Sequence, residues 1–195
     1  MKMRSSSFCV FSIILSLIIQ TLGLHEATEA GNAIKFTRTI NTCADPSLAE
    51  TVFQAFRAAS TVHVLNYRYG YEHVNTQSEA NFWQDIQPAF RAWPTQQNFT
   101  VPLFQLATAD RTQYIYQIDD DAQTPPVVNG FNTDVFIIGW VYDSQVCGSV
   151  PLMTTAFPAF TDHYYTISAF EHGGLVSAGW TDRGVVAFVL PLYNC

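Results

Sequence analysis

The feature that most constrains the fold is an internal repeat with a period of about 50 residues. Residues 101–104 (VPLF) return almost unchanged as residues 150–153 (VPLM). The apolar closing run 137–141 likewise returns at residues 185–189, and a fainter copy of the whole pattern starts near Thr51. Each copy holds two strand-like runs, a short turn and a closing strand, which cannot bury two faces alone. The copies must therefore pack on one another.

The repeat predicts one domain of three units, which span about residues 50–96, 101–145 and 150–192. Short β-branched and aromatic runs predict a mainly β fold with short helical turns. We expect a closed, β-trefoil-like arrangement with pseudo-threefold symmetry, because a ring of three units leaves no exposed strand edge and needs no capping unit. An open α+β repeat stack is the alternative.

Two local patterns predict elements within the units. Ser168 and Glu171 have the spacing of a capping box, which indicates the start of a short helix. In the first unit Tyr67, Tyr69 and Tyr71 alternate with other residues, as they would on one face of a strand. Such a tyrosine face is a common way to receive sugar rings.

Residues 1–30 have the pattern of a secretory signal peptide and leader. Lys2 and Arg4 precede an apolar run over residues 8–24, and small residues offer cleavage sites between residues 23 and 30. A signal anchor is the alternative, but the run is shorter than the roughly 20 residues that a membrane span needs. We therefore expect a secreted, extracellular protein with a domain at 31–195 and no membrane association after cleavage.

The charge balance argues against polyanionic partners. The chain has 9 Lys and Arg against 16 Asp and Glu, which gives a net charge of −7, and its arginines are scattered rather than gathered in a stripe. Nucleic acid and anionic lipid surfaces are therefore poor candidates as partners. Aromatic residues make up 14% of the chain, which suits a β-rich core and also suits sugar or peptide binding.

In an oxidising, extracellular compartment, cysteines are expected to form disulfides and Asn sequons to be glycosylated. Once Cys9 leaves with the leader, Cys43, Cys147 and Cys195 remain, so one thiol is free, blocked or paired between chains. The count alone leaves the pairing open. Asn98 begins the sequon Asn-Phe-Thr in a stretch between units and is a candidate glycosylation site.

The third unit carries motifs that resemble the repeats of the DUF5648 family: residues 151–152 (PL), 161–166 (TDHYYT), 168–171 (SAFE) and 184–189 (GVVAFV). The second unit departs from them, with TQY at 112–114 in place of TDH, and the first has TVH at 61–63. Members occur as secreted fungal proteins and attached to bacterial secreted enzymes. The resemblance implies the repeat fold and secretion rather than an activity.

The same resemblance implies a disulfide. Residues 43–49 (CADPSLA) and 147–152 (CGSVPL) are similar to the segments that introduce repeats in fungal members. This favours a Cys43–Cys147 bridge and leaves Cys195 for a disulfide-linked dimer. A Cys43–Cys195 bridge is the alternative.

Asp162, His163, Tyr165 and Trp180 are the candidate ligand-binding residues, since the third unit preserves the pattern best. Aspartate accepts hydrogen bonds from sugar hydroxyls, histidine donates or accepts, and aromatic rings stack on sugars. Strand alternation sends Asp162 and His163 to opposite faces unless a bulge intervenes.

Other chemistries lack a motif. Adjacent strand residues cannot all converge on a metal, so Asp162, His163, Glu171 and His172 do not predict a metal site. The run Asp119-Asp120-Asp121 lacks the remaining ligands of a calcium loop and is typical of a solvated loop. We expect no cofactor and no catalytic motif. The sequence thus favours a non-catalytic module that binds carbohydrate or a cell-wall polymer. A structural or interaction protein without sugar specificity is the alternative, and a hydrolase is less favoured.

Overall fold

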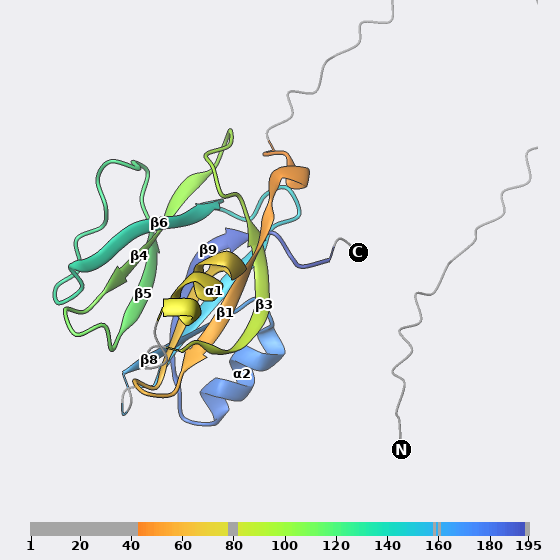
Figure 1. Ribbon diagram of the computed structural model, residues 1–195. Helices are drawn as coiled ribbons and strands as arrows, with labels where there is room; N and C mark the ends of the chain where they lie inside the picture. Colours follow the sequence, from red (N-terminus) through yellow and green to blue (C-terminus); the bar gives the residue numbers. More distant parts are fainter. Residues whose placement is uncertain (1–42, 78–81, 158, 160, 194–195) are drawn as a thin grey trace, which may run out of the picture. The chain divides into compact units, whose positions relative to one another are not determined.

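The computed structural model describes residues 43–77, 82–157, 159 and 161–193, and Figure 1 shows their arrangement. Among these residues, nine strands form three antiparallel sheets of three strands each. Sheet 1 comprises β1 (Glu50–Arg57), β2 (Val62–Tyr67) and β3 (Gln84–Ala92). Sheet 2 comprises β4 (Val101–Ala107), β5 (Tyr114–Ile118) and β6 (Thr133–Val141). Sheet 3 comprises β7 (Val150–Phe157), β8 (Asp162–Thr166) and β9 (Thr181–Val189). The mainly β prediction is confirmed.

Every sheet has the same strand order, with its first strand in the middle. The register shifts also fall at matching places, between Val52 and Phe53 in β1, between Leu103 and Phe104 in β4, and between Leu152 and Met153 in β7. Such shifts mark β-bulges, which bend a strand and increase its twist. The three sheets therefore share strand order and local distortion, and each lies within one of the expected units.

The ends of the closing strands join the sheets in a cycle. Arg91 pairs with Leu190, Trp140 pairs with Trp93, and Phe188 pairs with Tyr142. Each pair exchanges two backbone hydrogen bonds, with N···O distances of 2.7 to 3.1 Å. Each sheet is thus bridged to both of the others.

One hydrophobic core lies where the three sheets meet. It takes corresponding side chains from each sheet: Val52, Leu103 and Leu152 from the middle strands, Leu65, Tyr116 and Tyr165 from the second strands, and Ala92, Val141 and Val189 from the closing strands. All of these residues are buried. Aliphatic, β-branched and aromatic side chains fill this shared core, and further buried aromatic residues pack in two separate clusters.

Two of the core tyrosines carry buried hydrogen bonds between sheets. The Leu65 amide donates to the Tyr116 hydroxyl at 2.7 Å, and the Tyr116 amide donates to the Tyr165 hydroxyl at 3.2 Å. Leu65 occupies the corresponding position in sheet 1 and has no hydroxyl, so the Tyr165 amide donates to Gln54 Oε1 instead, at 3.0 Å. The bonds run from sheet to sheet and satisfy backbone amides inside the core.

Helices follow the second strand in sheets 1 and 3. They are α1 (Arg68–Gln77), which lies against β1 and β2 of sheet 1, and α2 (Ala169–Ser177), which lies against β7 and β8 of sheet 3. The expected helix start is confirmed, because the Ser168 hydroxyl accepts a hydrogen bond from the Glu171 amide at 3.2 Å. A further short 3-10 helix, η1 (Pro46–Leu48), precedes β1.

The expected tyrosine face on a strand is wrong. Tyr67 ends β2, whereas Tyr69 and Tyr71 lie in α1. Tyr71 turns inward, is 1% exposed, and donates its hydroxyl proton to the Val64 or the Phe53 carbonyl. Tyr71 thus anchors α1 against sheet 1.

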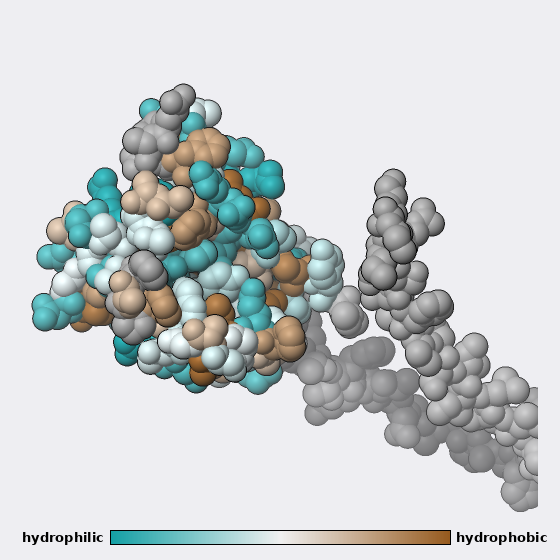
Figure 2. Space-filling model, turned by 90° about the horizontal axis from the view of Figure 1, so that it is seen from below, coloured by the Kyte–Doolittle hydropathy of each residue, from teal (hydrophilic) through white to brown (hydrophobic). Residues whose placement is uncertain are grey.

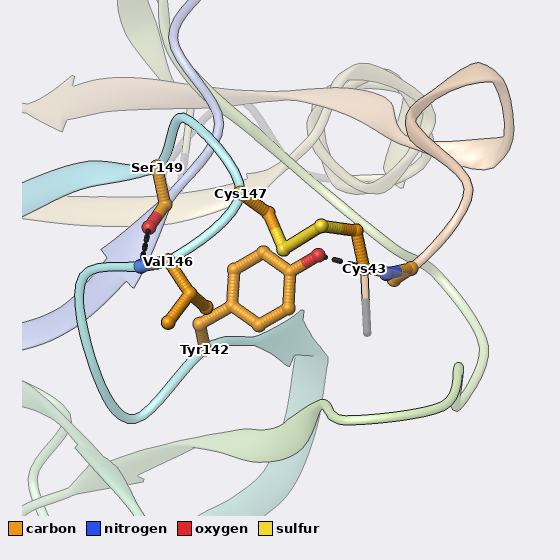
Figure 3. The surroundings of a disulfide bond; sticks show 6 residues. Cys43, Tyr142, Val146, Cys147 and Ser149 are labelled. Carbon is orange, nitrogen blue, oxygen red and sulfur yellow. Dashed lines mark hydrogen bonds between the residues drawn. A yellow bond between two sulfur atoms is a disulfide. The ribbon is translucent and has the colours of Figure 1, made fainter. Parts of the chain in front are cut away.

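A disulfide joins Cys43 to Cys147, with an S–S distance of 2.05 Å, and Figure 3 shows its surroundings. This is the pairing that the resemblance implied, and it excludes the Cys43–Cys195 alternative. Beside it the Ala44 amide donates to the Tyr142 hydroxyl at 2.9 Å. The Trp93 indole nitrogen donates to the Asp45 carbonyl at 2.6 Å, so the segment before β1 is held at several points. Cys195 and the expected leader 1–30 lie outside the described residues.

Candidate functional site

The structure separates the four predicted binding residues into two places. In β8, Asp162 points toward His63 of β2, whereas His163 and Tyr165 line a hollow between sheets 2 and 3. Trp180 packs against Phe157, with ring centroids 5.2 Å apart. The four residues therefore do not surround a single pocket, because strand alternation places neighbours on opposite faces.

His63 is the partner that sequence reasoning missed. Asp162 Oδ2 accepts a hydrogen bond from His63 Nδ1 at 2.6 Å, and Asp162 Oδ1 accepts one from the His63 amide at 2.8 Å. The two side chains are 7% and 21% exposed respectively. The contact fixes the imidazole ring and ties sheet 3 to sheet 1 across 99 residues of sequence.

A row of aromatic rings runs outward from this pair. The His63 ring lies 4.8 Å from the Phe56 ring and 5.0 Å from the Tyr164 ring, measured between centroids. Tyr164 in turn lies 6.2 Å from Trp180. Of the four predicted binding residues, Trp180 therefore belongs to this row and Asp162 contacts it through His63. His163 and Tyr165 are not part of the row.

The row borders what we name the sheet 1/3 groove. One part is a hollow of about 400 Å³ lined by Gln54, Phe56, His63, Asp85, Gln87 and Tyr164. An adjoining hollow of about 230 Å³ shares Gln54, Gln87 and Tyr164 and continues along β3 and β8 toward the start of α2. Together the two hollows form one depression between sheets 1 and 3.

Polar groups lie directly beside the rings of this groove. The Asp85 and Gln87 side chains are exposed on β3. The Tyr164 hydroxyl donates to Glu171 Oε1 at 2.9 Å. Burial, and then the neighbouring Glu171 carboxylate, raise the pKa of Tyr164 well above its usual range, so this phenol stays neutral. The groove thus offers a carboxylate, amides and a phenol next to apolar ring surface.

A separate depression, which we name the sheet 2/3 hollow, has a volume of about 500 Å³. Its lining includes His163, Tyr165 and Arg183 from sheet 3, Ile115 and Gln117 from β5, and the loop residue Phe131, and is completed by Tyr116, Ile118, Thr154, Val185 and Val186. His163 Nδ1 is buried there and has no hydrogen-bond partner among the described residues. Burial lowers the pKa of His163, with the nearby Asp162 charge opposing and the Arg183 charge adding to that effect.

The remaining candidates lie away from both depressions. In the loop before β6, Asp119 and Asp121 accept hydrogen bonds from backbone amides two residues on, as expected of a solvated turn. Within the described part of the chain, no three His, Cys, Asp or Glu side chains gather as a metal site. Asn98 is exposed between β3 and β4, where its glycosylation stays a prediction.

Surface hydropathy and helix length bear on possible membrane contact. On the face seen in Figure 2, hydrophobic and hydrophilic residues are interspersed. None of the helices in the described ranges is long and apolar enough to cross a membrane.

Comparison with known proteins places the chain in a family. Neither the search of curated proteins nor that of solved structures found a match. A family model described as "Domain of unknown function (DUF5648)" matches residues 51–190, which spans all three sheets almost completely. The chain therefore belongs to the DUF5648 family.

Proposed function

We propose that this protein is a secreted, non-catalytic module that binds carbohydrate, or a cell-wall polymer built of it, in the sheet 1/3 groove. The observation that carries the proposal is the row of Phe56, His63 and Tyr164 rings beside the exposed Asp85 and Gln87 side chains. Sugars present apolar C–H faces and a rim of hydroxyls. This groove offers complementary groups for both.

The rings come from two different sheets, which gives the groove its rigidity. Phe56 and His63 belong to sheet 1, whereas Tyr164 belongs to sheet 3. The buried Asp162 carboxylate holds His63 between them through two hydrogen bonds. Aromatic surface that is fixed before binding loses little conformational freedom on binding, which favours affinity.

The proposal includes the closed, β-trefoil-like arrangement. It is supported by the cycle of backbone bridges, Arg91 with Leu190, Trp93 with Trp140 and Tyr142 with Phe188. A linear stack would leave its two end sheets without a mutual bridge. An experimental structure in which the sheets are not related by rotations of about one third of a turn would overturn this part.

A glycan array probed with the protein secreted from the full chain tests the binding proposal. Saturable signal on defined glycans supports it, and the bound glycan is then titrated against variants. We expect Phe56→Ala and Tyr164→Ala each to weaken binding about tenfold or more, which corresponds to about 1.4 kcal/mol. Phe170→Ala is the matched control, because Phe170 is 93% exposed on α2 outside the groove.

Two outcomes contradict the proposal in different ways. Turnover of a labelled polysaccharide would indicate a hydrolase, in which the His63 and Asp162 pair would be the first residues to test as a general base. No glycan binding on the array, or an equal loss of affinity in Phe170→Ala and Tyr164→Ala, would favour a structural or interaction protein without sugar specificity.

A further inference from the structure

The sheet 2/3 hollow occupies the position in sheet 3 that the sheet 1/3 groove occupies in sheet 1. His163 pairs with Ala156 across sheet 3 as His63 pairs with Phe56 across sheet 1. Thr154 lies opposite Tyr165 as Gln54 lies opposite Leu65. The two depressions can therefore be compared residue by residue.

The comparison shows that only one of the two histidines, His63, is hydrogen-bonded to a carboxylate. His63 Nδ1 donates to Asp162, which the neighbouring sheet supplies. The residue of sheet 2 that corresponds to Asp162 is Gln113, which exchanges hydrogen bonds with Thr108 at the start of the β5 hairpin. His163 therefore receives no carboxylate from the adjacent sheet. Its Nδ1 stays without a partner in the part of the chain that the structure describes.

The charged residues that line the two depressions have opposite signs, although the neighbouring Asp162 charge acts on His163 more strongly than the Arg183 charge does. Arg183 lines the sheet 2/3 hollow, and the residues that line it include no Asp or Glu. By contrast, Asp85 lines the groove. In a chain of net charge −7, a hollow with an arginine and no acidic side chain is locally complementary to an anion.

The rest of the lining is largely apolar. Ile115 and Phe131 come from sheet 2 and its loop, and Val185 and Val186 come from β9. The hollow of about 500 Å³ lies within the roughly 300 to 1,000 Å³ that is usual for small-molecule sites. This lining suits an apolar body better than a sugar, which would leave most of its hydroxyls unpaired.

We propose that the sheet 2/3 hollow binds a small organic monocarboxylate with an apolar, ring-sized body. The carboxylate accepts hydrogen bonds from the exposed Arg183 guanidinium and, once the His163 ring turns its buried Nδ1 toward the hollow, from that nitrogen, in the role that Asp162 fills for His63. The body packs against Ile115, Phe131 and Val185. The site shares only Tyr165 with the lining of the proposed carbohydrate groove, so either proposal can fail without the other.

Titration calorimetry of the full secreted protein with 2-naphthylacetate and its neutral analogue 2-naphthylacetamide tests this site. The two probes share size and apolar surface and differ in charge. We expect the acid to bind at least tenfold more tightly than the amide. Arg183→Gln should remove that difference, whereas Arg68→Gln, which removes an exposed charge from α1, should preserve it.

A second readout locates the contact. Nitrogen NMR of the imidazole rings should show the His163 Nδ1 resonance moving on addition of the acid, while the His63 resonance stays in place. Tyr164→Ala should leave acid binding unchanged, which separates this site from the groove. Equal binding of acid and amide, equal effects of the two arginine variants, or no binding by 2-naphthylacetate, phenylacetate and decanoate would each overturn the proposal.

Discussion

Removing the Cys43–Cys147 disulfide should cost a large part of the stability of this domain. The bridge closes a loop with a sequence separation of 104 residues. In the chain-entropy treatment, cross-linking a loop of that length lowers the entropy of the unfolded state, which stabilises the folded state by about 4.7 kcal/mol at 25 °C. Domains of this size have free energies of unfolding of roughly 5 to 15 kcal/mol, so the change amounts to a third or more of the total.

This figure applies fully only if the segment before β1 stays docked until the whole domain unfolds. Two hydrogen bonds favour that, from the Ala44 amide to the Tyr142 hydroxyl at 2.9 Å and from the Trp93 indole to the Asp45 carbonyl at 2.6 Å. At about 1 kcal/mol each, they keep the segment in place without the covalent bond. Strain in the folded state or residual structure in the unfolded state lowers the expected loss to about 2 to 4 kcal/mol.

The assay compares guanidinium unfolding of the wild-type protein with that of a Cys43→Ala, Cys147→Ala double variant, both on a Cys195→Ser background that prevents thiol exchange. We expect a fall in the midpoint and an increase in the slope, because the unfolded chain becomes more expanded. Trp93→Phe with the disulfide intact is the control for docking. A loss below about 1 kcal/mol in the double variant would refute the reasoning, since the segment would then detach before the sheets unfold.

Three further changes follow from the buried polar contacts. Tyr116→Phe leaves the buried Leu65 amide without its acceptor and should lower the free energy of unfolding by about 1 to 3 kcal/mol in urea titrations. Asp162→Asn replaces a charge-assisted bond to His63 and should lower the melting temperature, with a loss of about 1.5 to 3 kcal/mol. The lowered pKa of His163 means that folding favours the neutral imidazole, so its contribution to the free energy of unfolding is present above about pH 6.5 and is lost as the pH falls. His163→Gln should therefore reduce the loss of stability between pH 7.5 and pH 5.

The controls for these changes come from the same chain. Tyr193→Phe removes a hydroxyl from a side chain that is 79% exposed and should leave stability unchanged. A Tyr116→Phe protein as stable as the wild type would show that the buried amide is satisfied in another way. A pH dependence that is identical in wild type and His163→Gln would assign the titration to a different group.

The sequence predicts the order of elements well because spacing and alternation are local properties. Residues near 101 and 150 begin equivalent strands, and Ser168 caps α2. The tyrosine pattern misled because alternation over three residues also fits the start of a helix. Tyr71 and Val74, three residues apart and both packed in one cluster, were the better signal.

The site could be predicted only in part, for a physical reason. Alternation within β8 is readable from sequence and correctly separates Asp162 from His163. The partner of Asp162 is not readable in that way, because His63 lies 99 residues earlier on another sheet. Pairing across sheets depends on how they close on one another, and no local pattern encodes that.

The cycle of bridges has a consequence for how the chain could be rearranged. Arg91 pairs with Thr51 at the start of β1 and with Leu190 just after β9, so the beginning and the end of the three sheets lie beside one strand. A short linker could therefore join residue 190 to residue 50, and the chain could be opened in the exposed turn at residues 94–98. A circular permutant of this kind lacks the segment before β1 and its disulfide, so it should retain the fold with the lower stability expected of the Cys43→Ala, Cys147→Ala variant.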